Sequence, residues 1–139
     1  MDCIFCKIIK GEVGSNKVYE NENVLALLDV NPISTGHTLI IPKKHFNDIF
    51  DIDEDYLKEI IVAAKLISKK TKDNLGAVGI NLLQSNGSKA GQVIFHFHLH
   101  VIPRYQDDKL RSHKIFADSR EIKTNSTDLI EIERRINNE

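Results

Sequence analysis

The sequence predicts an α+β fold in which a mostly antiparallel sheet carries one long helix on one face. Strand-like segments stand both before and after a single long helical segment, residues 54–74. A histidine-rich segment, residues 96–102, alternates polar and apolar side chains, which is typical of a strand with one buried face. With 139 residues, the chain fits one domain, residues 1–139, that is long enough to form a core.

The strands of this sheet are indicated by apolar and β-branched runs between turn residues. The first two runs are joined by a short polar turn at 21–23, as in a hairpin. The third run, 37–42, is almost entirely apolar, so we expect a central strand covered on both faces. In chain order, the predicted strands are 18–20, 24–28, 37–42, 78–84 and 93–103.

Two segments have the pattern of amphipathic helices. Asp51 and Glu54 have the spacing of a capping box before the long segment, and Gly76 suits its C-terminal end. A partial apolar stripe predicts a short final helix over 127–136. The stripe of the long helix consists of Leu57, Ile60, Ile61, Ala64 and Ile67.

Composition and charge narrow the class of protein. Hydrophobic residues make up 41% and charged residues 28%, as in ordinary globular proteins, and the formal net charge is -1. We therefore expect neither nucleic acid nor a membrane as a partner, because there is no basic field and no long apolar run. The N-terminus lacks the pattern of a signal peptide, which favours a cytoplasmic location. The two cysteines form a Cys3-x-x-Cys6 pair, which in a reducing compartment indicates metal binding or redox chemistry rather than a structural disulfide.

The segment from His96 to Ile102 is the part of the chain most suggestive of chemistry. On a strand, His96, His98 and His100 share one face, and the apolar residues between them share the other. A polar face that happens to contain histidine is one interpretation. A second is a metal site, although no Asp or Glu lies between residues 74 and 104 to complete it. A third is a neutral imidazole that attacks phosphorus or an acyl carbon while its neighbours stabilise the developing charge.

The same segment resembles the signature of the histidine triad superfamily, in which three histidines alternate with apolar residues. The resemblance extends, in order and spacing, to four further blocks of the Hint-like bacterial-type branch. It covers residues 3–105 and leaves 106–139 as a C-terminal extension. The four blocks are Phe5-Cys6-Lys7-Ile8-Ile9, Leu28-Asp29-Val30-Asn31-Pro32, the stretch from Gly36 to His45, and Gly91-Gln92.

The resemblance implies a nucleotide hydrolase or transferase that acts at the α-phosphate. His98 matches the nucleophile, which forms a nucleotidyl-histidine intermediate, and His100 matches a group that binds a phosphate oxygen. His96 belongs to the same catalytic row, and His37 matches a residue at the edge of the pocket. The family's substrates include adenosine phosphoramidates, aminoacyl-adenylates and dinucleoside polyphosphates, and its chemistry requires no metal. A different class, a purine-nucleotide-binding regulatory or scaffold protein with incidental hydrolysis, remains the alternative.

The resemblance also implies a set of nucleotide contacts. Asp29 matches the residue that binds the ribose hydroxyls, although its position also suits a turn at the end of a strand. Ser85 stands where relatives have Asn or Gln, so Asn86 is expected to replace that contact. Val93 stands where many relatives have Ser or Thr, which leaves only its backbone amide for phosphate. The remaining matches are the base-binding Phe5, Ile8, Leu27 and Val30, and the phosphate-binding amides of Gly91 and Gln92.

Two further expectations rest on the resemblance. Many bacterial relatives hold a structural zinc ion with residues that match Cys3, Cys6, His45 and His96, a closed Cys₂His₂ set. The alternative is a pair of free thiols with His45 on the surface. The family also implies a five-stranded antiparallel sheet and a homodimer whose sheets join across the interface.

Overall fold

The computed structural model describes residues 2–110 and 126–138, and a five-stranded sheet forms its centre. The strand order is β1-β2-β3-β5-β4, and each neighbouring pair is antiparallel. The α+β class and the antiparallel sheet predicted from the sequence are therefore confirmed. The strands are β1 (Lys17–Glu20), β2 (Val24–Leu28), β3 (Thr38–Pro42), β4 (Gly79–Leu83) and β5 (Leu99–Arg104).

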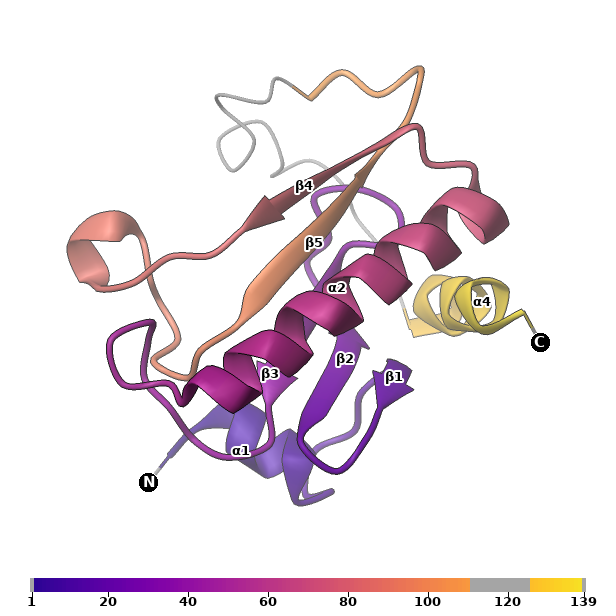
Figure 1. Ribbon diagram of the computed structural model, residues 1–139. Helices are drawn as coiled ribbons and strands as arrows, with labels where there is room; N and C mark the ends of the chain where they lie inside the picture. The colour runs from indigo at the N-terminus through magenta and orange to yellow at the C-terminus, as the bar shows by residue number, and fades with distance from the viewer. Residues whose placement is uncertain (1, 111–125, 139) are drawn as a thin grey trace.

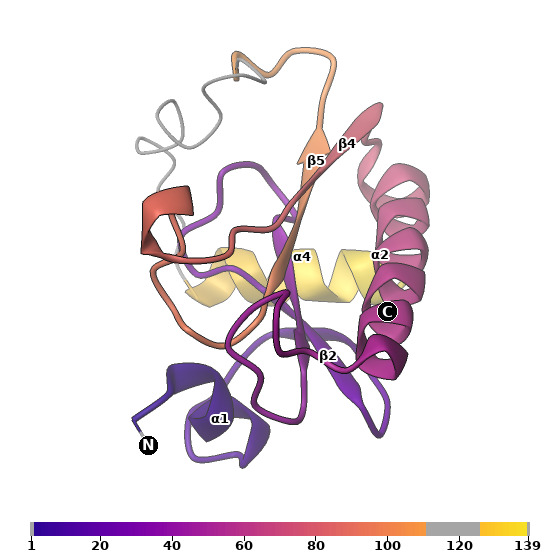
Figure 2. The ribbon, with the colours of Figure 1, turned by 60° about the vertical axis from the view of Figure 1, so that its left-hand side comes forward.

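Helices lie on both faces of this sheet. Helix α2 (Glu54–Leu75) crosses one face along its length (Figure 1). Helix α1 (Ile4–Ile9) and the 3₁₀ turn η1 (Ser88–Ala90) lie on the opposite side, as the nearly edge-on view in Figure 2 shows. Helix α1 was not predicted, because its six residues are too few to show an amphipathic period. None of the helices described is both long and apolar enough to cross a membrane.

Helix α2 begins without the predicted capping box. Its N-cap is Asp53, whose side chain makes no capping hydrogen bond. The carboxylate of Asp51 instead accepts hydrogen bonds from the backbone N–H groups of Asn47 and Asp48, which closes the preceding loop. The predicted end is confirmed, because Gly76 adopts a left-handed φ of 80° that favours glycine.

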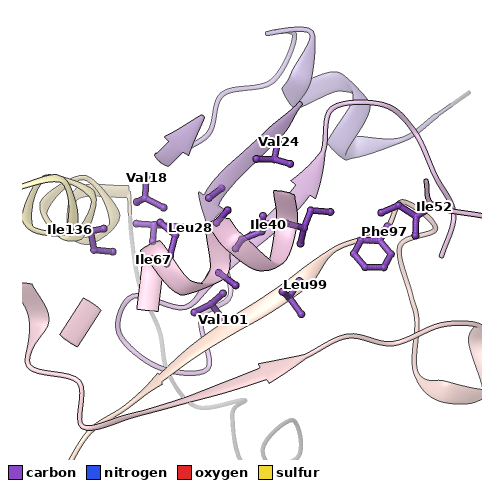
Figure 3. Packing of buried hydrophobic residues seen from close by; sticks show 14 of the residues in the cluster. Val18, Val24, Leu28, Ile40, Ile52, Ile67, Phe97, Leu99, Val101 and Ile136 are labelled. Carbon is purple, nitrogen blue, oxygen red and sulfur yellow. The ribbon is translucent and has the colours of Figure 1, made fainter. Parts of the chain in front are cut away.

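The main core lies between α2 and the sheet (Figure 3). Phe97, Leu99 and Val101 all point into it, together with Ile40 of β3 and Ile67 of α2. Strand β3 is buried along its whole length, which confirms its predicted central position. A second cluster on the other face packs α1 against β2 and β3, so the two faces of the sheet have separate apolar layers.

The predicted fifth strand, 93–103, is wrong at its N-terminal end, because β5 begins only at Leu99. The ladder between β3 and β5 runs from Thr38 opposite Val101 to Ile40 opposite Leu99. It cannot continue far beyond this point, since Pro42 has no N–H to donate. The carbonyl of Pro42 instead accepts a hydrogen bond of 2.8 Å from Nε2 of His96. His96 and His98 therefore precede the strand.

Helix α4 (Ser126–Asn137) covers the β1 edge of the sheet. The side-chain amide of Asn137 donates to the backbone carbonyl of Lys17 over 3.3 Å. Leu129 and Ile136 are buried in the main core beneath α2. The final helix predicted over 127–136 is thus confirmed, with one further residue at each end.

Candidate active site

Three imidazoles meet on the face of the sheet opposite α2. His98 and His100 lie next to each other with ring centroids 5.1 Å apart, and His37 approaches His100 at the same ring distance of 5.1 Å. His98 and His100 point to this face because they alternate with Leu99 and Val101, which fill the main core. The structure therefore brings together three of the four predicted catalytic histidines.

The tautomer of His98 is fixed by the main chain. Its Nδ1 lies 2.8 Å from the carbonyl oxygen of His96. A carbonyl only accepts hydrogen bonds, so Nδ1 carries the proton and Nε2 keeps its lone pair in the neutral ring. Burial lowers the pKa of His98 below its usual value, although the His96 carbonyl and the charge of Asp29 act in the opposite direction. The result is an imidazole whose Nε2 lone pair is free near neutral pH.

A second hydrogen-bond chain fixes His37 and His100. The backbone N–H of Ile33 donates to Nδ1 of His37 over 3.0 Å, so the proton of His37 sits on Nε2. That proton is donated to Nδ1 of His100 over 2.9 Å. In its neutral form His100 therefore carries its own proton on Nε2, as a hydrogen-bond donor.

Burial keeps both of these rings neutral. Burial and the neighbouring His100 together lower the pKa of His37 to about 3. Burial and the neighbouring His98 lower the pKa of His100 to about 4. Near neutral pH both rings can therefore donate hydrogen bonds beside His98 without bringing a positive charge into the site.

Asp29 lies at the end of β2, close to these imidazoles. Its Oδ2 is 3.7 Å from Nε2 of His37, and its Oδ1 accepts from the N–H of Asn31 over 2.8 Å. Burial raises the pKa of this carboxyl above its usual value, while the Asn31 hydrogen bond and the proximity of His98 lower it. The structure thus places the predicted ribose-binding residue beside the histidines.

The ring of His96 belongs to a different group, formed with Cys3, Cys6 and His45. Nδ1 of His96 lies 3.4 Å from Sγ of Cys3 and 3.6 Å from Sγ of Cys6. Nδ1 of His45 lies 3.3 Å from Sγ of Cys6. Both ring nitrogens of His96 are thus directed at Pro42 and the cysteines, and the prediction that its ring acts in the catalytic row needs correction. Its carbonyl, not its ring, reaches His98.

These four residues fit a zinc ion in spacing and in chemistry. Sulfur and nitrogen ligands of one tetrahedral zinc are about 3.6 Å apart, given bond lengths of about 2.3 and 2.05 Å. The observed separations of 3.3–3.6 Å match this value. Burial and the neighbouring Cys3 raise the pKa of the Cys6 thiol in the absence of a cation. A metal ion would stabilise both thiolates.

The two imidazoles of this group also have the outer hydrogen bonds typical of metal ligands. Nε2–H of His96 donates to Pro42, and Nε2–H of His45 donates to Oδ1 of Asn47 over 3.2 Å. Both Nδ1 atoms are therefore left with lone pairs directed at the cysteines. Sequence reasoning missed Asn47 and the carbonyl of Pro42, because only the folded chain shows which oxygen faces a ring.

A second group of possible ligands, Asp29, His37 and His100, is less suited to a metal. Nδ1 of His37 accepts the Ile33 N–H. If Nε2 bound a metal, the ring proton would have to move to Nδ1, where it would face that N–H, and two donors would meet. The nitrogens of His37 and His100 are only 2.9 Å apart, a hydrogen-bond distance. We interpret this group as a hydrogen-bonded relay.

Two backbone amides predicted to bind phosphate, those of Gly91 and Gln92, are used within their own loop. The N–H of Gly91 donates to Ser88 and the N–H of Gln92 donates to Gly87, so neither amide is directed at a ligand. The backbone N–H of Val93 donates to no acceptor in the described part of the chain, and it remains available. The side chain of Val93 is exposed.

The other predicted nucleotide contacts differ in how well their positions suit that role. Asn86 uses its side-chain oxygen to accept the Ile49 N–H over 2.7 Å, so it organises the loop. Its neighbour Ser85 is partly buried. Val30 is 65% exposed and contributes nothing to an apolar wall as it stands. Phe5, Ile8 and Leu27 are buried together on the site face, and the ring of Phe5 lies 5.3 Å from that of His98.

Fold and site together define a class of small α+β proteins in which a neutral imidazole with a free Nε2 lies beside two hydrogen-bonded histidines. The comparisons identify the family. The HIT domain model matches residues 10–107, and the chain therefore belongs to the HIT family.

Individual proteins show the same relationship. Protein hit of Bacillus subtilis is 46% identical over 104 residues, which cover 75% of this chain and 72% of that protein. Adenosine 5'-monophosphoramidase HNT1 of Candida albicans is 43% identical over 106 residues, covering 73% and 70% respectively. The crystal structure of a Zn-bound histidine triad family protein from Mycobacterium smegmatis has a TM-score of 0.85 at 32% identity, covering 99% of this chain and 92% of that one.

Proposed function

We propose that this protein is a nucleotide hydrolase or transferase that attacks the α-phosphate of its substrate with Nε2 of His98. The observation that carries the proposal is the hydrogen bond from Nδ1–H of His98 to the His96 carbonyl, which leaves Nε2 as the nucleophilic atom. Membership of the HIT family supports it, as does the similarity to an adenosine 5'-monophosphoramidase.

The first step forms a bond between Nε2 and phosphorus while the bond to the leaving group breaks. Positive charge then develops on the imidazole, and both the His96 carbonyl at Nδ1–H and the nearby Asp29 stabilise it. Nε2–H of His100 and the N–H of Val93 would stabilise the phosphoryl oxygens. Water then attacks the same phosphorus, which releases the nucleoside monophosphate and restores the lone pair on His98.

The nucleotide would be oriented by Asp29 and the apolar side chains on the site face. Asp29 would accept hydrogen bonds from the ribose hydroxyls, because its carboxylate lies beside His37 at the end of β2. Phe5, Ile8 and Leu27 would form the wall against a purine base. Suitable substrates are adenosine phosphoramidates, aminoacyl-adenylates and dinucleoside polyphosphates.

We further propose that Cys3, Cys6, His45 and His96 bind a structural zinc ion. The ion would neutralise the two thiolates and hold α1 against the segment that leads into β5. The Zn-bound relative from Mycobacterium smegmatis supports this assignment. Catalysis would use no metal, since His100 and the Val93 amide supply the electrophilic groups.

We also propose a homodimer in which the sheets of two copies join at β4. Of the two edges, β1 is covered by α4, whereas β4 pairs only with β5 in the described chain. An open edge is a template for another strand. Leu82 on β4 is exposed, and α2 also exposes Ile61, Val62 and Leu66. On α4, Leu129 and Ile136 are already buried in the core, whereas Ile130 is exposed. Light scattering of the purified protein would distinguish the dimer from a monomer.

The catalytic proposal is tested by mass spectrometry of the intact protein during turnover of adenosine 5'-phosphoramidate, quenched without acid. Wild type is expected to gain the mass of one adenylyl group, and His98→Ala is expected to gain none. His98→Ala that still forms the adduct would exclude His98 as the nucleophile. Binding of adenosine monophosphate without turnover or adduct would favour a nucleotide-binding regulatory or scaffold protein instead.

A further inference from the structure

The buried side chain of Gln92 joins two loops around the site, namely the connection between β4 and β5 and the loop that contains Asn47. It is 4% exposed, and its Oε1 accepts the N–H of Gly87 over 2.7 Å. Its Nε2 donates to the carbonyls of Asn47, over 2.6 Å, and Ile94, over 3.1 Å. All its polar atoms thus hold protein groups, so the Gln92 side chain cannot also bind a ligand without breaking these contacts.

The three contacts fix the backbone on both sides of Val93. Gln92 precedes Val93, and the Ile94 carbonyl that follows is held by the same amide. The backbone N–H of Gln92 donates to the Gly87 carbonyl over 3.1 Å, which closes the turn around η1. The direction of the Val93 N–H therefore depends on the Gln92 side chain.

Asn47 connects this side chain to the cysteine and histidine cluster. Its carbonyl accepts from Gln92, and its side-chain Oδ1 accepts from Nε2–H of His45. A continuous set of hydrogen bonds runs from His45 through Asn47 and Gln92 to Gly87. A metal ion that fixed the ring of His45 would also fix Asn47, because the two side chains are hydrogen-bonded.

We propose that Asn47 and Gln92 are positioning residues that couple occupancy of the Cys3/Cys6/His45/His96 cluster to binding of a nucleotide phosphate at the Val93 amide. The proposal rests on the proposed function, since it takes Val93 as a phosphate contact. An occupied cluster holds His45 and with it Asn47, so the loop of residues 87–93 is preorganised for the phosphate. An empty cluster releases His45, and the amide loses its fixed direction.

The test compares the affinities for adenosine monophosphate and adenosine, which differ only in the phosphate. Isothermal titration calorimetry gives their ratio for the zinc-loaded wild type, the chelated wild type and Gln92→Met, a variant that keeps volume and removes the three hydrogen bonds. We expect metal removal and Gln92→Met each to lower the ratio about 10-fold, with adenosine affinity unchanged. Zinc content of Gln92→Met should stay at the wild-type level. A merely structural role would weaken both ligands equally.

Non-additivity provides the decisive result. If the two changes act through one path, chelating Gln92→Met should cause no further loss in the ratio. Asn47→Ala, on the exposed loop, should lower the ratio, and Asn47→Asp, which keeps the acceptor for His45, should restore it. Two results would overturn the coupling. One is an equal affinity ratio in the zinc-loaded and chelated wild type, and the other is a loss in chelated Gln92→Met equal to the product of the two separate losses. A ratio near one in the zinc-loaded wild type would instead overturn the proposed phosphate chemistry itself.

Discussion

The two faces of the segment from His96 to Val101 use burial in opposite ways. On the α2 face, Phe97, Leu99 and Val101 pack into an apolar core that needs no particular hydrogen bond. On the other face, His98 and His100 are also largely removed from water, yet ring nitrogens on this face have specific partners. The comparison shows how one stretch of backbone separates stability from chemistry, because alternate side chains face different layers.

The largest expected effect is on activity, from a change on the histidine face. Replacing His98 by Ala removes the proposed nucleophile, so turnover of adenosine 5'-phosphoramidate should fall about 10⁴-fold or more. The melting temperature should change by less than about 3 °C, since little apolar packing is lost. Steady-state kinetics and thermal unfolding measure the two quantities. Turnover within tenfold of wild type would contradict the division between the faces.

The second effect concerns the cluster of Cys3, Cys6, His45 and His96, where the proposed zinc ion would stabilise the fold. With zinc about a thousandfold above its dissociation constant, binding contributes about 4 kcal/mol, which chelation or Cys6→Ser should remove. We expect the melting temperature to fall by about 10 °C or more. Calorimetry on protein of known zinc content measures the change. As a control, chelator should have no further effect on Cys6→Ser, and identical melting curves for loaded and chelated wild type would exclude a stabilising role.

The third effect is on stability alone, from the residue next to His98. Leu99→Ala leaves a cavity in the core beneath α2, and it should lower the free energy of unfolding by about 3 kcal/mol. Urea denaturation measures this loss. At temperatures where the variant is folded, the adenylyl adduct on His98 should still form. Loss of the adduct in a folded Leu99→Ala protein would show that the two faces are not independent.

The smallest effect is a dependence of stability on acid. The pKa values of His37 and His100 are about 3 and about 4 in the folded protein, below the ordinary value of 6.5. In acid the unfolded chain therefore binds more protons than the folded chain. The free energy of unfolding falls as the pH drops from 6.5 toward these lower pKa values. Between about pH 6.5 and 5.5, each of these two rings should lower the free energy of unfolding by about 1 kcal/mol.

Denaturation in excess zinc at the two pH values tests this expectation, with His100→Asn as the matched variant. Over this interval the free energy of unfolding of the variant should fall by about 1 kcal/mol less than that of wild type, because one neutral buried ring has been removed. An unchanged dependence on pH in His100→Asn would show that this imidazole is not kept neutral by the fold.

Periodicity and turn residues determined much of this protein by sequence alone. The alternation from His96 to Val101 separated core from site, the apolar run 37–42 indicated the central strand, and the stripe of α2 indicated the covering helix. These are local properties, because the direction of a side chain relative to its neighbours follows from backbone geometry. The ordered blocks of the histidine triad pattern added the candidate nucleophile and the candidate zinc ligands by resemblance.

Tertiary structure decided which partner each polar group meets. Pro42 ends the β3–β5 ladder and turns the ring of His96 toward the cysteines, although its spacing predicts a place in the catalytic row. The amides of Gly91 and Gln92 close a turn, and the Gln92 side chain joins that turn to the loop that contains Asn47. Such contacts join residues far apart in the chain, and hydrogen bonds depend on distance and angle within a few tenths of an ångström. Neither quantity is encoded in the spacing of residue types, so only the assembled sheet divides the histidines between the cysteine cluster and the group around His98.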